Sequence, residues 1–232
     1  MESSFDLLEM WRNMAFLARA VNIMLAVCSV YSLWVIIDRA ALFRKVRRTT
    51  IEFIVGLRDQ LKAKDVGGAL TLAQKSDAPV AKVVYDALSE YRDGVEALET
   101  TGPEEIGDFD LVDAVNRVID RTKEQQVSEL KKGLGGLASI SSAAPFIGLF
   151  GTVVGIINAF RAMAATGQGG LGAVSAGISE ALFTTAVGLL VAIPAVMSFN
   201  YFTTVIEKFI VEMNGVSSEL LSYMLREGRD RK

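Results

Sequence analysis

Residues 177–202 read GISEALFTTAVGLLVAIPAVMSFNYF, an apolar run in which Glu180 is the only charged residue. A helix of about 20 apolar residues, rising about 1.5 Å per residue, crosses the hydrocarbon core of a bilayer. We therefore predict a transmembrane helix over residues 175–205. Its one carboxylate is the starting point for a functional hypothesis, because polar residues inside a membrane are costly and are often functional.

Two further stretches have the same character. Residues 20–37 and 133–160 contain no Asp, Glu, Lys or Arg. They predict transmembrane helices over residues 16–38 and 133–162, with a glycine-rich loop at 163–174. Phe5, Leu8 and Trp11 could share one helical face, so residues 1–15 predict a short periplasmic or interfacial helix.

The charged residues are concentrated in one part of the chain. Of 51 charged residues, 34 lie between Asp38 and Lys132, and Lys and Arg cluster directly after the first and third predicted spans. Positive charge marks the cytoplasmic side of a membrane. We therefore expect residues 39–132 and 206–232 to be cytoplasmic, and the N-terminus and the 163–174 loop to be periplasmic.

The cytoplasmic segments are predicted to be helical. Ile51, Ile54, Val55 and Leu61 have helical spacing in 49–64, and Leu111, Val112, Val115, Val118 and Ile119 mark another amphipathic helix. Pro79 is a suitable first helical residue, with Asp77 as a candidate cap.

An apolar stripe continues past the third span and consists of Ile206, Phe209, Ile210, Met213, Leu220 and Met224. The second and third spans are therefore expected to extend into the cytoplasm as long helices, with glycines 133, 135 and 136 as the only breaks beside the bilayer. The stripe needs a partner. Self-assembly and packing against residues 49–100 of the same chain are both open.

Glu180 is the strongest candidate for chemistry. Burial in a membrane disfavours the charged form of a carboxyl group, so Glu180 could exchange protons near neutral pH. Thr184 lies one helical turn further on, Thr185 lies beside that face, and Thr152 is near the middle of the second span. Their hydroxyls could order water beside a carboxylate. For Glu180, the alternatives are a position at the outer edge of the membrane and a structural hydrogen bond. For the threonines, they are hydroxyls that only bond to helix carbonyls or join helices.

Glycines and prolines within the spans indicate packing and bending. Gly151 and Gly155 have GxxxG spacing, with Gly148 three residues earlier, and such spacing lets helix backbones approach closely. Pro145 and Pro194 each free a carbonyl and can bend a helix.

Composition argues against other classes. The chain has no His, and Cys28 is its only cysteine, so we expect no metal site and no disulfide within the chain. It has no GxxxxGK[ST] loop, and a net charge of −3 does not suggest a nucleic-acid partner. We expect neither an enzyme nor a cofactor.

Three segments carry a resemblance to a known family: ALTLAQKSDAPVAKVVYDAL (69–88), PFIGLFGTVVGIINAF (145–160) and residues 177–202. They resemble the ExbB, TolQ and MotA proton-channel family, and within it most closely the ExbB and TolQ branch. The resemblance covers most of the chain. It implies a pentameric ring in the bacterial inner membrane, around an ExbD-like or TolR-like single-span partner with a membrane aspartate. It places the family's pore glutamate at Glu180 and its two threonines at Thr152 and Thr185; Thr184 rests on helix geometry alone.

The implied activity is proton flow that drives a TonB-like or TolA-like protein, for outer-membrane transport or envelope maintenance. A motor for gliding or surface motility, and a non-conducting membrane scaffold, remain alternatives, as does sodium in place of the proton.

Overall fold

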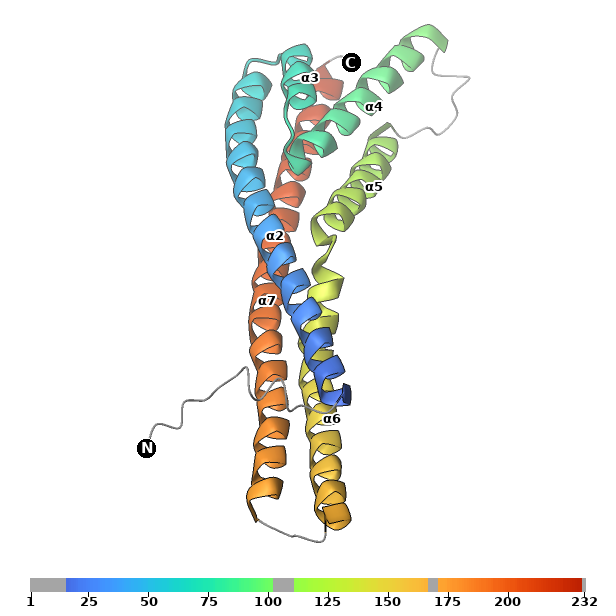
Figure 1. Cartoon of the computed structure of the whole chain (residues 1–232). Coiled ribbons are helices and arrows are strands. Elements are labelled where there is room, and N and C mark those ends of the chain that lie inside the picture. The colour runs from blue at the N-terminus through green and yellow to red at the C-terminus, as the bar shows by residue number, and fades with distance from the viewer. Residues whose placement is uncertain (1–15, 102–110, 167–170, 231–232) are drawn as a thin grey trace. The chain divides into compact units, whose positions relative to one another are not determined.

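The computed structural model describes residues 16–101, 111–166 and 171–230, and every regular element within them is an α-helix. The helices are α2 (Phe16–Lys62), α3 (Val66–Lys75), α4 (Pro79–Thr101), α5 (Leu111–Lys131), α6 (Leu134–Thr166) and α7 (Leu171–Asp230) (Figure 1). The helix predicted for residues 1–15 lies outside the described residues.

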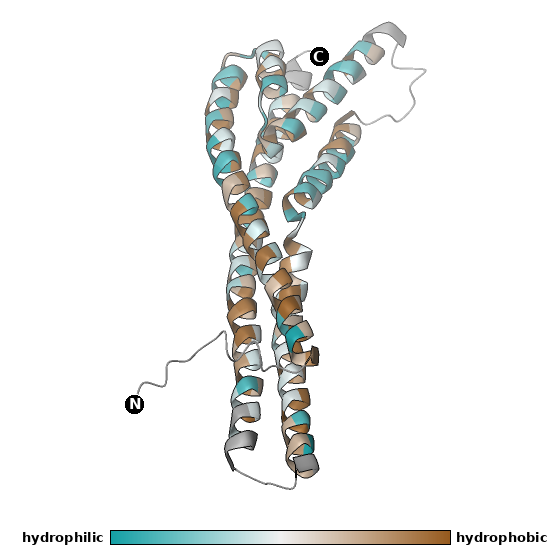
Figure 2. Cartoon of the chain, in the orientation of Figure 1, coloured by the Kyte–Doolittle hydropathy of each residue, from teal (hydrophilic) through white to brown (hydrophobic). Residues whose placement is uncertain are grey.

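Three of these helices are long and apolar enough to cross a membrane: α2, α6 and α7. Figure 2 shows apolar residues along α6 and many hydrophilic ones on α4 and α5. The prediction of an all-α membrane protein with three spanning helices is confirmed. The long extension predicted for the third span is also found, because α7 has 60 residues where a bilayer needs about 20. The second span does not extend in the same way, because α6 begins at Leu134. The first span lies in a helix of 47 residues, α2.

The loop predicted at 163–174 is shorter on both sides than expected. Helix α6 continues to Thr166 and α7 begins at Leu171, while residues 167–170 lie outside the described part of the chain. Alanine and methionine at 162–165 favour a helix, which extends α6 past Arg161. The membrane boundaries within these helices remain predictions.

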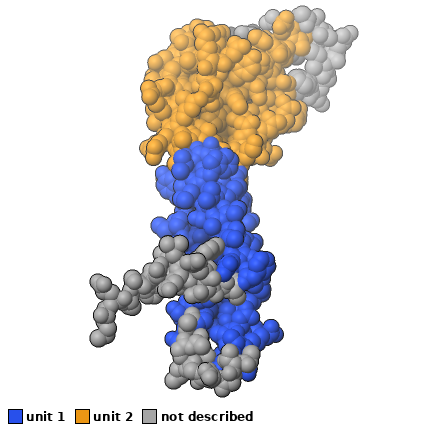
Figure 3. Space-filling model, viewed as in Figure 1, with its two compact units in different colours: residues 1–38, 133–202 blue, residues 39–132, 203–232 orange. Residues whose placement is uncertain are grey.

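The chain divides into two compact units (Figure 3). Unit 1 comprises residues 1–38 and 133–202, and unit 2 comprises residues 39–132 and 203–232. In unit 1, α2, α6 and α7 share a small buried cluster that consists of Val21, Leu25, Ala144, Val191 and Ala192. The alanines of this cluster, Ala144 and Ala192, allow close packing beside the larger Leu25.

Unit 2 has a larger apolar core, to which all five of its helical segments contribute. Phe53 and Leu57 of α2 pack there with Ala69 of α3, Leu88 of α4 and Ile119 of α5. Burying a leucine or phenylalanine side chain contributes about 1.5–3 kcal/mol. A core of this size identifies unit 2 as a packed domain.

The apolar stripe of α7 is buried within the chain. Met213, Leu220 and Met224 belong to the core of unit 2 and are at most 2% exposed, and the ring of Phe209 stacks on that of Phe43 at 6.2 Å between centroids. Of the two partners left open by the sequence, the structure therefore shows packing within the same chain.

The stripe predicted on residues 49–64 is displaced around the helix. Phe53 and Leu57 are 2% exposed, whereas Ile51 and Val55 are 56% and 60% exposed. Ile54 and Leu61 are packed at the edge of the core. Both sets have helical spacing, so periodicity alone did not decide which face is buried.

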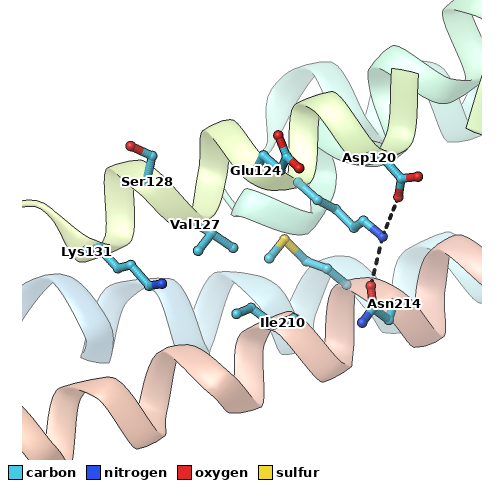
Figure 4. Close-up of a pocket in the computed structure, with 9 residues that line it drawn as sticks. Asp120, Glu124, Val127, Ser128, Lys131, Ile210 and Asn214 are labelled. Atoms are coloured by element: carbon cyan, nitrogen blue, oxygen red, sulfur yellow. Dashed lines mark hydrogen bonds and ion pairs between the residues drawn. The ribbon is translucent and has the colours of Figure 1, made fainter. Parts of the chain in front are cut away.

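Polar contacts join α5 to α7 beside this core. The Lys123 ammonium lies between the carboxylate of Asp120 and the side-chain oxygen of Asn214, 2.9 Å from each (Figure 4). Its side chain is only 22% exposed. Two charge-assisted contacts therefore compensate for the partial burial of this charge.

Helices α5 and α6 are separated by a break at Gly133, which has a left-handed backbone with φ of 83°. This is one of the three glycines that the sequence marked as possible breaks. The backbone N–H of Lys132 still bonds to the carbonyl of Glu129, and α6 starts at Leu134. Glycine adopts this conformation without the steric cost that a Cβ brings.

Gly133→Ala should lower the stability of the full chain by about 1–2 kcal/mol, the cost of a left-handed non-glycine residue. An added Cβ would lie 3.5 Å from Val35 Cγ1, which is ordinary contact, so the loss would be conformational. The matched control is Gly135→Ala in α6, whose Cβ would meet nothing within 4 Å. That variant should be neutral or stabilising by up to about 1 kcal/mol. Thermal unfolding in detergent measures both, and equal responses would contradict the assignment of the break to Gly133.

Asp77 is not a helix cap, contrary to the prediction. Helix α4 begins at Pro79, and Ala78 precedes it with a carbonyl that accepts from the N–H of Ala81 at 2.9 Å. The Asp77 carboxylate instead accepts a hydrogen bond of 2.9 Å from Lys45. That bond, with the positive charges of Lys45 and Lys82, holds the pKa of Asp77 below its ordinary value.

Because the pKa of Asp77 is lowered in the folded state, its stabilising contribution exists above the unfolded value of about 3.9 and is lost as the pH falls through the folded pKa. Asp77→Asn should therefore melt slightly below wild type at pH 7 and level with it in strong acid. The pair is exposed, so the effect should be small and reduced by salt. Melting curves across pH test this; a difference that persists at pH 2 would refute it.

Candidate functional site

The contact between α6 and α7 in unit 1 is unusually close. A Cβ added at Gly148 would lie 3.1 Å from the carbonyl oxygen of Thr184, and one at Gly188 would lie 2.7 Å from the carbonyl oxygen of Ala144. At Gly155 an added Cβ would lie 2.8 Å from that of Ala181. Glycine at these positions lets the two backbones touch.

The close approach brings the hydroxyls of Thr152 and Thr185 into direct hydrogen-bond contact. The Thr152 hydroxyl also faces the carbonyls of Gly148 and Ala181 at 3.2 Å, and that of Thr185 donates to Gly148 at 3.1 Å. The two hydroxyls have one hydrogen each, so these contacts are alternatives, and either hydroxyl can be the donor in the bond between them. One bond goes to a carbonyl of the same helix, and two go to carbonyls of the facing helix. The threonines therefore bond to their own helix and also join the two helices, which are the two structural roles considered from the sequence.

Thr184 faces another way. It is fully buried, its Cγ2 would be 2.5 Å from a Cβ added at Gly151, and its hydroxyl lies 3.3 Å from the carbonyl of Glu180 one turn earlier. The Asn22 side-chain amide of α2 donates to that hydroxyl at 3.3 Å. The structure therefore groups Thr152 with Thr185, and Thr184 with Asn22.

Asn22 is a site residue that the sequence reasoning missed. It is 7% exposed although it lies within the apolar first span. The signal was present, because Asn22 is the only amide side chain in residues 20–37. An amide at such a position needs a hydrogen-bond partner, and interhelical bonds to Asn are common in membranes.

Glu180 lies on α7 directly before Ala181, whose carbonyl faces Thr152, and four residues before Thr184. Its side chain is half-buried in the single chain. Pro145 of α6 is half-buried and Pro194 of α7 is exposed, each inside its helix. Each removes one helix hydrogen bond, but neither takes part in the threonine contacts.

This arrangement suits proton exchange better than metal binding. Among the described residues there is no group of three or more His, Cys, Asp or Glu side chains that could hold a metal ion. Residues 133–202 contain one carboxyl group, that of Glu180, and the hydroxyls of Thr152 and Thr185, either of which can be the donor in their shared bond. A carboxyl group and hydroxyls of this kind can donate and accept protons.

The fold defines a helical protein with three helices that are long and apolar enough to cross a membrane. The sequence pattern described as the MotA/TolQ/ExbB proton channel family matches residues 76–215. The chain belongs to this family, as its resemblance predicted.

Individual relatives agree. The chain is 32% identical over 218 residues to a protein of Pseudomonas putida named biopolymer transport protein ExbB, covering 94% of this chain and 63% of the relative. Proteins of that name from Salmonella typhimurium and Neisseria meningitidis are 29% identical over 234 residues and 32% identical over 183. These alignments cover 98% and 78% of this chain, and 89% and 80% of those relatives. The chain thus spans under two thirds of the Pseudomonas relative.

Thr152→Val keeps the shape of the side chain and removes its hydroxyl, so it should lower stability by about 0.6–2 kcal/mol, the range for interhelical hydrogen bonds in membranes. Thr152→Ser keeps the hydroxyl and should lose less. Unfolding of both variants in detergent measures the difference. If the serine variant is the less stable, the hydroxyl contact does not hold the seam.

Proposed function

We propose that this chain is a proton-conducting motor subunit of the bacterial inner membrane, energised by the proton motive force. Glu180 is the proton-carrying group, and the Thr152–Thr185 pair and Thr184 are the polar residues beside it. The family supports a proton channel. The observation that carries the residue assignment is the hydroxyl pair held across the α6–α7 seam, next to the one carboxylate of α7's apolar run.

The energetics of a buried carboxyl group support this role. Ionised Glu180 inside the bilayer would cost roughly 2.5–3.5 kcal/mol, so it favours the protonated form unless a polar path stabilises the charge. Each proton that crosses 100 mV releases about 2.3 kcal/mol. One proton therefore supplies energy of the same order as the cost of ionising Glu180 once.

The proposed assembly follows the family resemblance. Five copies form a ring with their Glu180 side chains toward a shared lumen, around an ExbD-like or TolR-like helix that contributes an aspartate. Proton exchange between that aspartate and the ring drives motion, which is passed to a TonB-like or TolA-like protein for outer-membrane transport or envelope maintenance. The N-terminus is then periplasmic, and unit 2 and the C-terminus are cytoplasmic. The relatives' printed name, biopolymer transport protein, favours the transport load over gliding motility.

Glu180→Gln should abolish proton uptake into pH-dye-loaded vesicles that contain the chain and its ExbD-like partner, because glutamine cannot carry a proton. The matched control is Glu212→Gln, also on α7 but exposed in unit 2, which should conduct like wild type. Thr185→Val should reduce the flux without abolishing it. Replacing the proton gradient by a sodium gradient should give no flux.

The assembled complex must be shown intact in each variant by size-exclusion chromatography. Normal flux in Glu180→Gln with an intact complex would refute the role of Glu180. A non-conducting scaffold predicts a different pattern, in which Glu180→Gln weakens the complex and wild type carries no flux above empty vesicles.

A further inference from the structure

Unit 2 contains a polar cavity of about 770 Å³ that is separate from the membrane site. Four helices and the α3–α4 connection line it, through Lys45, Ala73, Gln74, Ser76, Asp77, Lys82, Tyr85, Asp86, Thr122, Gln125, Gln126 and Glu129. Its volume lies in the range of small-molecule sites, about 300–1,000 Å³. Because most of its lining residues are polar or charged, this cavity suits a ligand that forms hydrogen bonds.

The most buried polar groups of the cavity come from α5. Thr122 is 2% exposed, and its hydroxyl donates to one carboxylate oxygen of Asp86 at 2.7 Å. Gln126 follows one turn later and is 6% exposed, and its amide makes no hydrogen bond with any residue that the structure describes. The amide atoms of Gln126 are not among the fully enclosed polar atoms, so they face the cavity that the residue lines and are open to a ligand.

The charges of the cavity do not balance internally. Lys45 pairs with Asp77 at 2.9 Å, and Lys82 with Glu129 at 3.6 Å. Asp86 is half-buried, and no lysine or arginine of the described residues lies within ion-pair distance of it. The cavity therefore offers one carboxylate without a cation, beside an amide without a hydrogen-bond partner.

We propose that this cavity binds a guanidinium group, with Asp86 as its carboxylate partner and the Gln126 side-chain oxygen as a second acceptor. A guanidinium is planar and presents five donors, which suits several acceptors around one centre. An anion is disfavoured, because both lysines already have carboxylate partners. The proposal does not depend on proton conduction.

A second groove of unit 2 lacks these features. Between α5 and α7, Lys123 is already held by Asp120 and Asn214 (Figure 4). The rest of the lining consists of the apolar Val127, Ile210 and Met213 and the exposed Glu124, Ser128 and Lys131. Nothing polar and buried is left without a partner there. Of these two grooves, the Asp86 cavity is the one whose polar groups suit a bound cation.

The test uses the full chain in lipid nanodiscs and three probes of similar size: N-ethylguanidinium, ethylammonium and the neutral N-ethylurea. Titration calorimetry or ligand-observed NMR should show saturable binding of N-ethylguanidinium, weaker binding of ethylammonium and none of N-ethylurea. Asp86→Asn should weaken N-ethylguanidinium at least about tenfold, as loss of a charge-assisted hydrogen bond predicts. The control Glu124→Gln removes an exposed carboxylate of α5 outside the cavity and should leave binding unchanged.

Gln126→Glu tests the same site independently, in case Asp86→Asn does not fold. It adds a second carboxylate to the cavity, so it should tighten N-ethylguanidinium binding several-fold, and Gln126→Lys should abolish it. Equal affinity in wild type, Asp86→Asn and Gln126→Glu would overturn the site. So would no saturable binding to wild type.

Two further probes distinguish the natural source of the guanidinium group. Agmatine represents a free metabolite, and the capped tripeptide Gly-Arg-Gly represents an arginine in a protein segment. Both should be weakened by Asp86→Asn if the site is correct. Tighter binding of the tripeptide than of agmatine assigns the site to a protein partner, and the reverse assigns it to a small molecule. Binding of both that ignores Asp86→Asn counts against the proposal.

Discussion

The structure of unit 1 depends on the backbone contact between α6 and α7. Within a bilayer, helices gain no hydrophobic energy by leaving lipid, so association rests on close packing and hydrogen bonds. Gly148 and Gly188 lie where an added Cβ would press on the opposite backbone. This contact sets the distance between the helices, and every other interaction of the seam follows from that distance.

The threonine cluster is a direct consequence of it. A threonine hydroxyl is only two bonds from its own backbone, so Thr152 and Thr185 can meet only where the helices nearly touch. The Thr152 hydroxyl also reaches the carbonyl of Ala181 across the seam. Packing and polar chemistry are therefore one feature, and a substitution that widens the seam also separates the hydroxyls beside Glu180. This explains why stability and flux have to be measured together.

Hydropathy predicted the three spans because a bilayer imposes one simple requirement on length and polarity. It also singled out Glu180, since a lone charge in an apolar run is visible in the sequence. The pairing of Thr152 with Thr185, and of Thr184 with Asn22, was beyond reach because rotation about a helix axis is set by the neighbouring helices. For the same reason, the sequence predicted Ile51 and Val55 on the buried face of residues 49–64, where the structure buries Phe53 and Leu57. Asp77 was wrongly predicted to be a helix cap, because an aspartate is suited both to capping a helix and to pairing with a lysine.

The filled core of unit 2 limits how copies of the chain can associate. The α7 stripe cannot serve as a subunit interface, because Met213 and Leu220 are already covered by the chain itself. Large apolar side chains that unit 2 leaves exposed include Ile51, Val55 and Val211, at 56%, 60% and 70%. These residues are few and are interspersed with charged ones, as at the polar rim of an interface. In unit 1, α2, α6 and α7 expose many large apolar residues, but lipid can cover these as well as another copy can. Contacts between copies in the membrane would therefore depend on close packing and hydrogen bonds.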